Sequence, residues 1–410
     1  MTERVKRRKL DDSAEAVGKK ADFYHPASED DRKSWNGFCE LESDPALFNV
    51  MLREFGVTGV KVQDVYALDD DFFASLPKPV YGVIFLFRWH EDDPDKQEAS
   101  CPDGLWFANQ TASNACATVA LLNIVNNIEG ADLGENLRNF KEFTMPFTPA
   151  LRGDAINNFE FVKRIHNSFS RKMDILNSDL QLKHEAQSKR NRSKKRGREE
   201  NVADAGFHFI AFVPVLGKVW KFDGLERQPQ ALGTLEPGMD WLDLAMPNIR
   251  SRMAEAETEI SIQSLVRDPL PGLVKQLAMN IRHLASVEKA IASQEQGTTG
   301  IDPLPENTLR EPDDSYGVTE KSVQEAAGHV EIGDCLGRSV DELVQHRKRV
   351  SMEQIDLKMA IREEQQLRQE DDEKAARRRY DYGPAIRTWL RFLAHKRVIE
   401  DLIPIAKEFR

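Results

Sequence analysis

Apolar residues recur at three- and four-residue steps shortly after Asp44-Pro45, a pair that is typical of a helix start. The positions are Leu47, Phe48, Met51, Leu52 and Phe55. Gly56 follows directly, and a glycine there favours a helix end because it adopts a left-handed backbone at little cost. The pattern therefore predicts an amphipathic helix that closes at Gly56.

Three stretches have the pattern of strands. Residues 80–87 are apolar almost without interruption, which predicts a fully buried strand near the centre of a sheet. Residues 207–214 and 218–223 are rich in apolar and aromatic residues and flank Leu216-Gly217, so they predict the two strands of a β-hairpin.

A second helix is expected to begin near Cys116. Apolar residues cover almost its whole circumference, so the helix belongs inside the domain. Asn114 or Ser113 could cap its N-terminus, and Gly130 is the expected stop.

Polar segments divide the chain into parts. Residues 1–34 are charged and lack periodicity, which indicates a flexible tail before a compact domain over 35–270. Within that domain, residues 183–204 contain almost no apolar side chain and predict a mobile, basic insertion. We expect a helix and a linker in 271–345 and a helical region in 346–410, whose dense apolar end suggests a docking element.

The composition argues against two classes of protein, general nucleic-acid binders and membrane proteins. The 410 residues are 40% hydrophobic, 30% charged and 8% aromatic, enough for a core beside long solvated helices. The formal net charge of -11 argues against general nucleic-acid binding. No stretch approaches the roughly 18 to 20 apolar residues of a membrane span, and the N-terminus has no apolar leader. We therefore expect a soluble protein in the cytoplasm and nucleus, with no membrane contact.

The cysteines carry the first candidate chemistry. The four of them, Cys39, Cys101, Cys116 and Cys335, have neither a metal-ligand spacing nor a compact disulfide pattern, which favours a reducing compartment. Only Cys116 begins a predicted helix, where the helix dipole and free amides favour a nucleophilic thiolate. Gln110, six residues upstream, could donate a hydrogen bond to the oxyanion that forms on an attacked carbonyl. From this window alone, the sequence favours a buried small cysteine and a loop glutamine.

The hairpin adds the other candidate groups. His208 opens its first strand and Asp223 closes its second, so the turn brings them opposite each other to within about two positions. Asp223 would then hold the imidazole tautomer while the other ring nitrogen faces the thiolate. The order Gln, Cys, His, Asp along the chain favours a catalytic interpretation over four unrelated residues.

Seven stretches together resemble the ubiquitin C-terminal hydrolase family of papain-like cysteine peptidases. They are Glu40–Pro45, Val80–Trp89, Phe107–Gln110, Asn114–Thr118, His166–Phe169, and Phe207–Phe209 with the later Asp223–Leu225. They occur in the family's order and span about 35 to 270. The resemblance implies a mixed α/β (α+β) fold, with a central antiparallel sheet flanked by helices and a C-terminal helical extension.

The resemblance also implies roles and partners. Cys116 would be the nucleophile, His208 the general base and then acid, Asp223 the residue that orients it, and Gln110 an oxyanion-hole donor beside the Cys116 amide. The expected reaction is hydrolysis after the last glycine of ubiquitin, without cofactor or metal.

Residues 346–410 resemble the C-terminal domain of long family members, which bind the proteasome's ubiquitin receptor or a Polycomb-type chromatin complex. The basic run 189–198 lies where the family has its active-site crossover loop. It could admit large conjugates, contact an acidic partner such as nucleosomal DNA, or be a solvated loop.

Two other functions remain open at this stage. A catalytically silent ubiquitin-binding adaptor could keep the fold as a scaffold, but it would not need all four of Gln110, Cys116, His208 and Asp223. Another papain-like acyl transferase, such as a transglutaminase, would not require the C-terminal docking helix. His166 is interpreted as structural, with a possible part in shaping the approach to the active site, and the other three cysteines as packing or surface thiols.

Overall fold

The structure is a computed structural model that describes residues 25–89, 92–180, 183, 206–255, 260–294, 303–305, 307–326 and 339–398. The basic run 189–198, Cys335 and the last twelve residues, 399–410, lie outside this described part. So do residues 1–24 of the expected tail and almost all of the expected insertion.

A six-stranded antiparallel sheet forms the centre of the fold, in the order β1-β6-β2-β3-β4-β5. The strands are β1 Val60–Asp64, β2 Val80–Arg88, β3 Phe207–Val215, β4 Lys218–Asp223, β5 Gln230–Thr234 and β6 Ser261–Arg267. The apolar run predicted as a central strand is β2, which pairs with β3 and β6. The predicted hairpin is β3–β4, and its turn residues Leu216 and Gly217 both have the positive φ that a tight hairpin requires.

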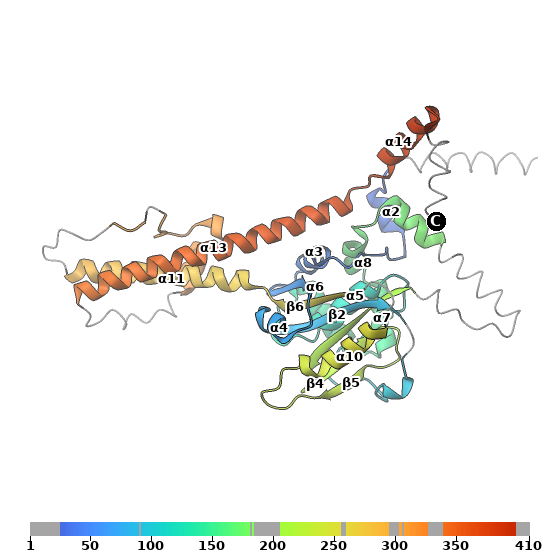
Figure 1. Ribbon diagram of the computed structural model, residues 1–410, viewed down its shortest axis with the longest axis horizontal. Coiled ribbons are helices and arrows are strands. Elements are labelled where there is room, and N and C mark those ends of the chain that lie inside the picture. Colours follow the sequence, from blue (N-terminus) through green and yellow to red (C-terminus); the bar gives the residue numbers. More distant parts are fainter. Residues whose placement is uncertain are drawn as a thin grey trace, which may run out of the picture.

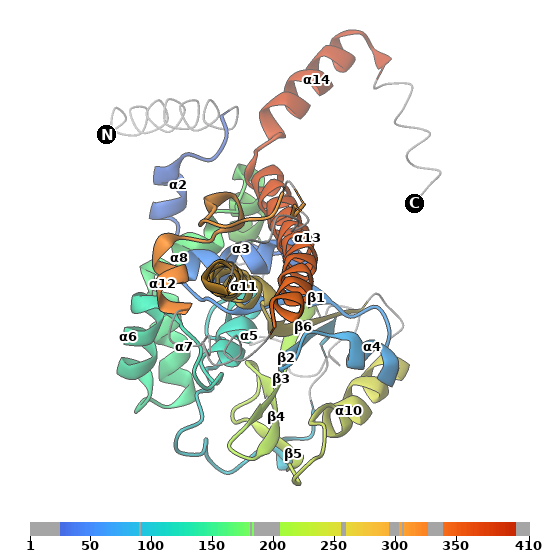
Figure 2. The ribbon, with the colours of Figure 1, turned by 90° about the vertical axis from the view of Figure 1, so that its left-hand side faces the viewer.

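Helices cover both faces of this sheet (Figures 1 and 2). One face carries α3 Pro45–Phe55, α5 Cys116–Val125, α6 Gly134–Thr144, α7 Pro149–Asn158 and α8 Glu160–Asn167, and the other carries α4 Asp70–Ser75 and α10 Leu242–Glu255. Successive β3 residues alternate between the two apolar clusters, Phe209 facing α5 and Ile210 facing α10. The predicted fold class is confirmed: a mixed α/β domain with an antiparallel sheet between helices.

Helix α3 agrees with the first sequence pattern. Asp44 caps it by accepting a hydrogen bond from the Ala46 amide, and Gly56 ends it with φ of 88°. Helix α5 ends at Val125, before the predicted stop at Gly130. Just beyond this end, the Asn127 side chain accepts from the Trp106 amide and donates to the Trp106 carbonyl.

Order also begins earlier than Trp35. Helix α2, Glu29–Ser34, lies within the expected tail and starts with a capping box between Ser28 and Asp31. It is attached to the domain by Arg32, which donates to the Ser170 carbonyl, and by the ion pair of Asp31 with Lys172. The segment is polar, but a local capping box and two contacts with the domain are enough to order it as a helix.

The C-terminal part is a long pair of helices that projects from the domain that contains the sheet (Figure 1). Helix α11, Pro269–Gln294, lies beside α13, Val340–Arg379, and buries apolar side chains such as Leu277 and Ile361 between them. Part of the expected linker joins this core, because Tyr316 and Val318, at η4 Asp314–Tyr316 and before α12 Glu320–Glu325, are buried there. Helix α14, Gly383–His395, follows and buries none of its residues.

Candidate active site

Cys116 is the first residue of α5 and is partly accessible, whereas the rest of the helix is buried under β3. The predicted cap is wrong: Ala115 is the N-cap, and no side chain there accepts a hydrogen bond from the helix amides. Asn114 has a left-handed backbone, φ of 62°, and donates instead to the Phe38 carbonyl at 3.3 Å and the Ser178 hydroxyl at 3.4 Å. The positive end of α5 is therefore left to the thiol.

His208 and Asp223 come together through the register of the hairpin. Asp223 pairs with Ile210, so His208 lies two residues away on the same face of the sheet. The His208 Nε2 donates to Asp223 Oδ1 over 2.7 Å, which leaves Nδ1 for the Cys116 sulfur. Asp223 also accepts from the Leu225 amide at 2.9 Å and from the Trp89 indole at 3.2 Å, so its orientation is fixed by three donors.

The electrostatics of this pair favour the charged form of both groups. Burial alone would lower the pKa of His208, but hydrogen bonds and charge from Asp223 and Cys116 raise it to about 9. Burial alone would raise the pKa of Asp223, but its hydrogen bond to His208 and the His208 charge hold that pKa below its ordinary value. The arrangement can therefore hold a proton on the imidazole beside a nucleophilic sulfur.

Gln110 lies on the loop that leads into α5. Its backbone amide donates to the Gly224 carbonyl at 2.8 Å, which ties the loop to the turn that follows Asp223. The neighbouring Ala108 is fixed by two hydrogen bonds with the Asn123 side chain. The Gln110 Oε1 is buried and makes no hydrogen bond to any residue that the structure describes. The contacts that hold Gln110 in place are therefore those of its backbone amide with the Gly224 carbonyl.

A cavity of about 460 Å³ opens beside Cys116. Its lining includes the acidic Glu40 and Glu42 and the apolar Leu86 and Phe209. The wall therefore combines carboxylates with apolar surface.

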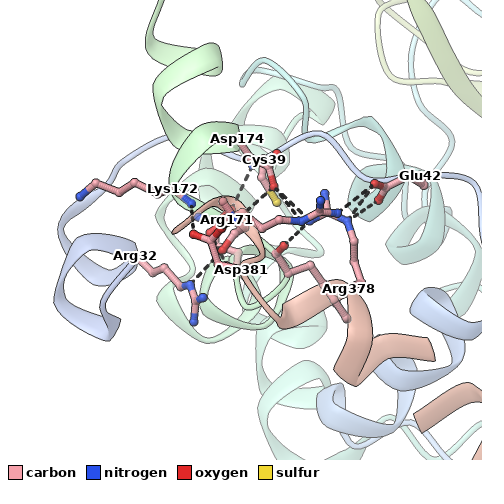
Figure 3. Close-up of polar contacts among 12 residues, drawn as sticks. Arg32, Cys39, Glu42, Arg171, Lys172, Asp174, Arg378 and Asp381 are labelled. Carbon is pink, nitrogen blue, oxygen red and sulfur yellow. Dashed lines mark hydrogen bonds and ion pairs between the residues drawn. The ribbon is translucent and has the colours of Figure 1, made fainter. Parts of the chain in front are cut away.

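Arg378, near the end of α13, contacts Glu42, one of the residues that line this cavity (Figure 3). Its guanidinium donates to both Glu42 carboxylate oxygens at 2.8 Å, to the Phe169 carbonyl at 2.7 Å and to Asp174 at 3.0 Å. The amide of Lys172 donates to Asp381 nearby. Sequence reasoning missed this contact, because nothing local pairs a glutamate near the N-terminus with an arginine of a solvated helix.

His166 and Cys39 form a separate buried pair. The His166 Nε2 donates to the Cys39 carbonyl at 2.8 Å, so Nδ1 accepts from the Thr118 hydroxyl at 2.7 Å. Burial lowers the pKa of His166 to about 4 and raises that of the Cys39 thiol to about 12. Cys101 is partly buried, and burial raises the pKa of its thiol too. Within the described ranges, no group of three or more His, Cys, Asp or Glu side chains could hold a metal ion.

No helix among the described residues is long and apolar enough to cross a membrane.

Comparison with known proteins gives one consistent result. Residues 38–254 match the protein family described as "Ubiquitin carboxyl-terminal hydrolase, family 1". The chain is 30% identical over 375 residues to ubiquitin carboxyl-terminal hydrolase isozyme L5 of Dictyostelium discoideum, covering 91% of this chain and 96% of that protein. It is 35% identical over 279 residues to ubiquitin carboxyl-terminal hydrolase ubh-4 of Caenorhabditis elegans, covering 65% and 79%.

Two further matches cover less. Ubiquitin carboxyl-terminal hydrolase BAP1 of Xenopus tropicalis is 35% identical over 232 residues, which are 54% of this chain and 31% of that protein. Among solved structures, the Trichinella spiralis UCH37 catalytic domain bound to ubiquitin vinyl methyl ester is 29% identical, with a TM-score of 0.44 over 57% of this chain and 96% of that one.

Proposed function

Since this chain belongs to the ubiquitin carboxyl-terminal hydrolases of family 1 and is a cysteine-type deubiquitinase, we propose that it hydrolyses the bond after the C-terminal glycine of ubiquitin through Cys116, His208, Asp223 and Gln110. The observation that carries the residue assignment is the hydrogen bond between His208 and Asp223, together with the position of the partly accessible Cys116 at the N-terminus of α5.

The reaction begins with attack of the Cys116 thiolate on the carbonyl carbon of ubiquitin's last glycine. The Gln110 side-chain amide and the Cys116 backbone N–H stabilise the oxyanion, in place of water. The His208 imidazolium then gives its proton to the leaving amine or thiol, and a thioester remains on Cys116. Neutral His208 takes a proton from water, which attacks the thioester and releases ubiquitin with a free carboxylate. Asp223 stays ionised throughout and keeps Nδ1 aimed at the sulfur.

The test uses ubiquitin that bears a thiol-reactive group in place of its C-terminal carboxylate. Incubated with the wild-type chain, it should add one ubiquitin mass, and Cys116→Ala should abolish the addition. If the wild type is not labelled, even with the C-terminal region removed, yet binds ubiquitin in a pull-down, the catalytically silent adaptor becomes the better assignment.

For the C-terminal region, we propose a protein partner that covers α14. Its apolar side chains Ile386, Trp389, Leu390 and Phe392 are all exposed. Three of them lie at i, i+3 and i+4, the spacing of a helix that docks in a groove. The family resemblance suggests either the proteasome's ubiquitin receptor or a Polycomb-type complex as the partner.

Titration of the chain with each purified receptor would decide between them. Trp389→Asp should abolish binding to the true partner while leaving labelling of Cys116 intact. Retained binding by this variant would refute the assignment to α14. A contact of the basic run 189–198 with nucleic acid and the location in cytoplasm and nucleus stay predictions.

A further inference from the structure

Lys221 on β4 is a fully buried lysine, with no part of its side chain exposed. Its ammonium donates to Glu226 Oε1 at 2.8 Å and to Asp92 Oδ2 at 2.6 Å, and Arg252 also pairs with Asp92. A buried cation is costly unless it is paired and hydrogen-bonded, so the position is tolerated only because both carboxylates meet it. The pairing of Lys221 with Glu226 spans five residues and encloses Asp223 between its ends.

Two hydrogen bonds close the turn formed by residues 223–226. The Glu226 amide donates to the Asp223 carbonyl at 3.1 Å, and the Leu225 amide donates to the Asp223 carboxylate at 2.9 Å. Because the ion pair joins the strand before the turn to its last residue, it limits how far the turn can open. The carboxylate that orients His208 is therefore part of the same braced unit.

The other side of the turn holds the loop of Gln110. The Asn109 side-chain amide donates to the Glu226 carbonyl at 2.6 Å and to the Gly224 carbonyl at 3.4 Å. The Gln110 amide donates to that same Gly224 carbonyl at 2.8 Å. A Cβ at Gly224 would lie 3.1 Å from both the Cβ and the amide nitrogen of Gln110. The two segments thus fit together with little slack, and a shift of the turn must move Gln110.

We propose that Lys221, Glu226 and Asn109 are positioning residues that set the oxyanion-hole side chain of Gln110 relative to Asp223. The ion pair fixes the turn, and Asn109 transfers that position to the loop. This inference rests on the proposed function of Gln110 as an oxyanion donor. The proposal assigns their effect on the reaction to Gln110, whereas an effect through Asp223 would persist in a variant that lacks the Gln110 amide.

The experiment is a double-mutant cycle between Glu226→Ala and Gln110→Ala. The substrate is ubiquitin with a fluorogenic amide at its C-terminus. Loss of an oxyanion donor costs about 10²- to 10³-fold in kcat, and misplacement of that donor should cost less, about tenfold, with KM unchanged. In the Gln110→Ala background, Glu226→Ala should then change kcat by less than about twofold, because the donor that it positions is already gone.

Three further variants separate positioning from stability. Glu226→Gln keeps an acceptor for Lys221 and should recover most of the kcat. Asn109→Ala cuts the link to the loop without touching the ion pair, so it tests the same route if Glu226→Ala does not fold. Glu364→Ala is the matched control, since Glu364 accepts from Lys61 at 2.6 Å in a partly buried pair between α13 and β1. It should lower the melting temperature and leave kcat unchanged.

The outcomes are distinct. Equal losses of kcat from Glu226→Ala in both backgrounds, or a loss of stability without a loss of kcat, would overturn the positioning role and leave the proposed function intact. A Gln110→Ala enzyme with wild-type kcat would remove the oxyanion role and the inference together, while labelling of Cys116 by the ubiquitin probe would still report on the nucleophile.

Discussion

The catalytic unit contains two histidines that are both buried and both close to a cysteine, His208 with Cys116 and His166 with Cys39. His208 faces the Asp223 carboxylate at 2.7 Å, whereas His166 has two neutral partners, the Thr118 hydroxyl and the Cys39 carbonyl. The pKa of the first rises to about 9 and that of the second falls to about 4. Burial is shared, so the carboxylate decides which imidazole holds a proton at neutral pH.

The two cysteines also differ in their surroundings. Cys116 begins a helix and is partly accessible, whereas Cys39 is fully buried and donates weakly to the His166 carbonyl at 3.7 Å. Although Arg378 lies close enough to Cys39 to lower its pKa, burial dominates and raises that pKa to about 12 (Figure 3). A cysteine and a histidine side by side are therefore insufficient for nucleophilic chemistry.

The largest expected effect separates the two cysteines. Cys116→Ala should lower kcat/KM on the fluorogenic ubiquitin substrate by more than about 10⁴-fold, because the proposed thioester forms on the Cys116 sulfur. Cys39→Ser, which keeps a small polar side chain at the buried site, should retain the wild-type kcat. If Cys39→Ser loses activity while its melting temperature is preserved, then Cys39 takes part in catalysis and the assignment of Cys116 as the only nucleophile is wrong.

Without the Asp223 carboxylate, His208 should resemble His166, with neutral hydrogen-bond partners and a lower pKa. Asp223→Asn should lower kcat about 10²-fold, since general acid–base catalysis depends on an oriented, charged imidazole. In the wild type, His208 stays protonated below about pH 9, so the rate should fall only as the pH rises through that value. Without the negative charge the pKa of His208 drops, and the basic limb of the profile of kcat/KM against pH should move to lower pH. An unmoved basic limb would show that another group sets it.

Alkylation measures the sulfurs directly. With a pKa of about 12, only about one Cys39 thiol in 10⁴ is ionised at pH 8, and that thiol is also inaccessible. Iodoacetamide at pH 8 should therefore modify Cys116 well before Cys39, as read by mass spectrometry of peptides over time. In the Asp223→Asn variant the rate at Cys116 should decrease, because the carboxylate that orients the neighbouring His208 ring and raises its pKa is gone.

The sequence predicts local relations better than distant ones. The pairing of His208 with Asp223 follows from the hairpin register, and α3 follows from its cap and its periodicity, because both depend on neighbours along the chain. The expected caps of α5 failed because the Asn114 side chain instead bonds to Phe38 and Ser178. The burial of Lys221 could not be foreseen either, since its partner Asp92 comes from a separate segment of the chain.

The smallest expected effect concerns stability at the second pair. The unfolded chain binds a proton at His166 near pH 6.5, but the folded chain does so only near pH 4, so stability present above pH 6.5 is lost as the pH falls toward 4. At pH 4.5 this group alone should cost roughly 2 to 3 kcal/mol of unfolding free energy. His166→Gln can replace both hydrogen bonds without titrating, so urea unfolding at pH 7 and 4.5 should show a smaller loss of unfolding free energy at acid pH in the variant.

For His208 the sign is opposite, because its contribution to stability is complete below pH 6.5 and is lost as the pH rises toward 9. Equal acid losses in wild type and variant would mean that His166 is protonated in the folded chain, and the contrast between the two histidines would then fail.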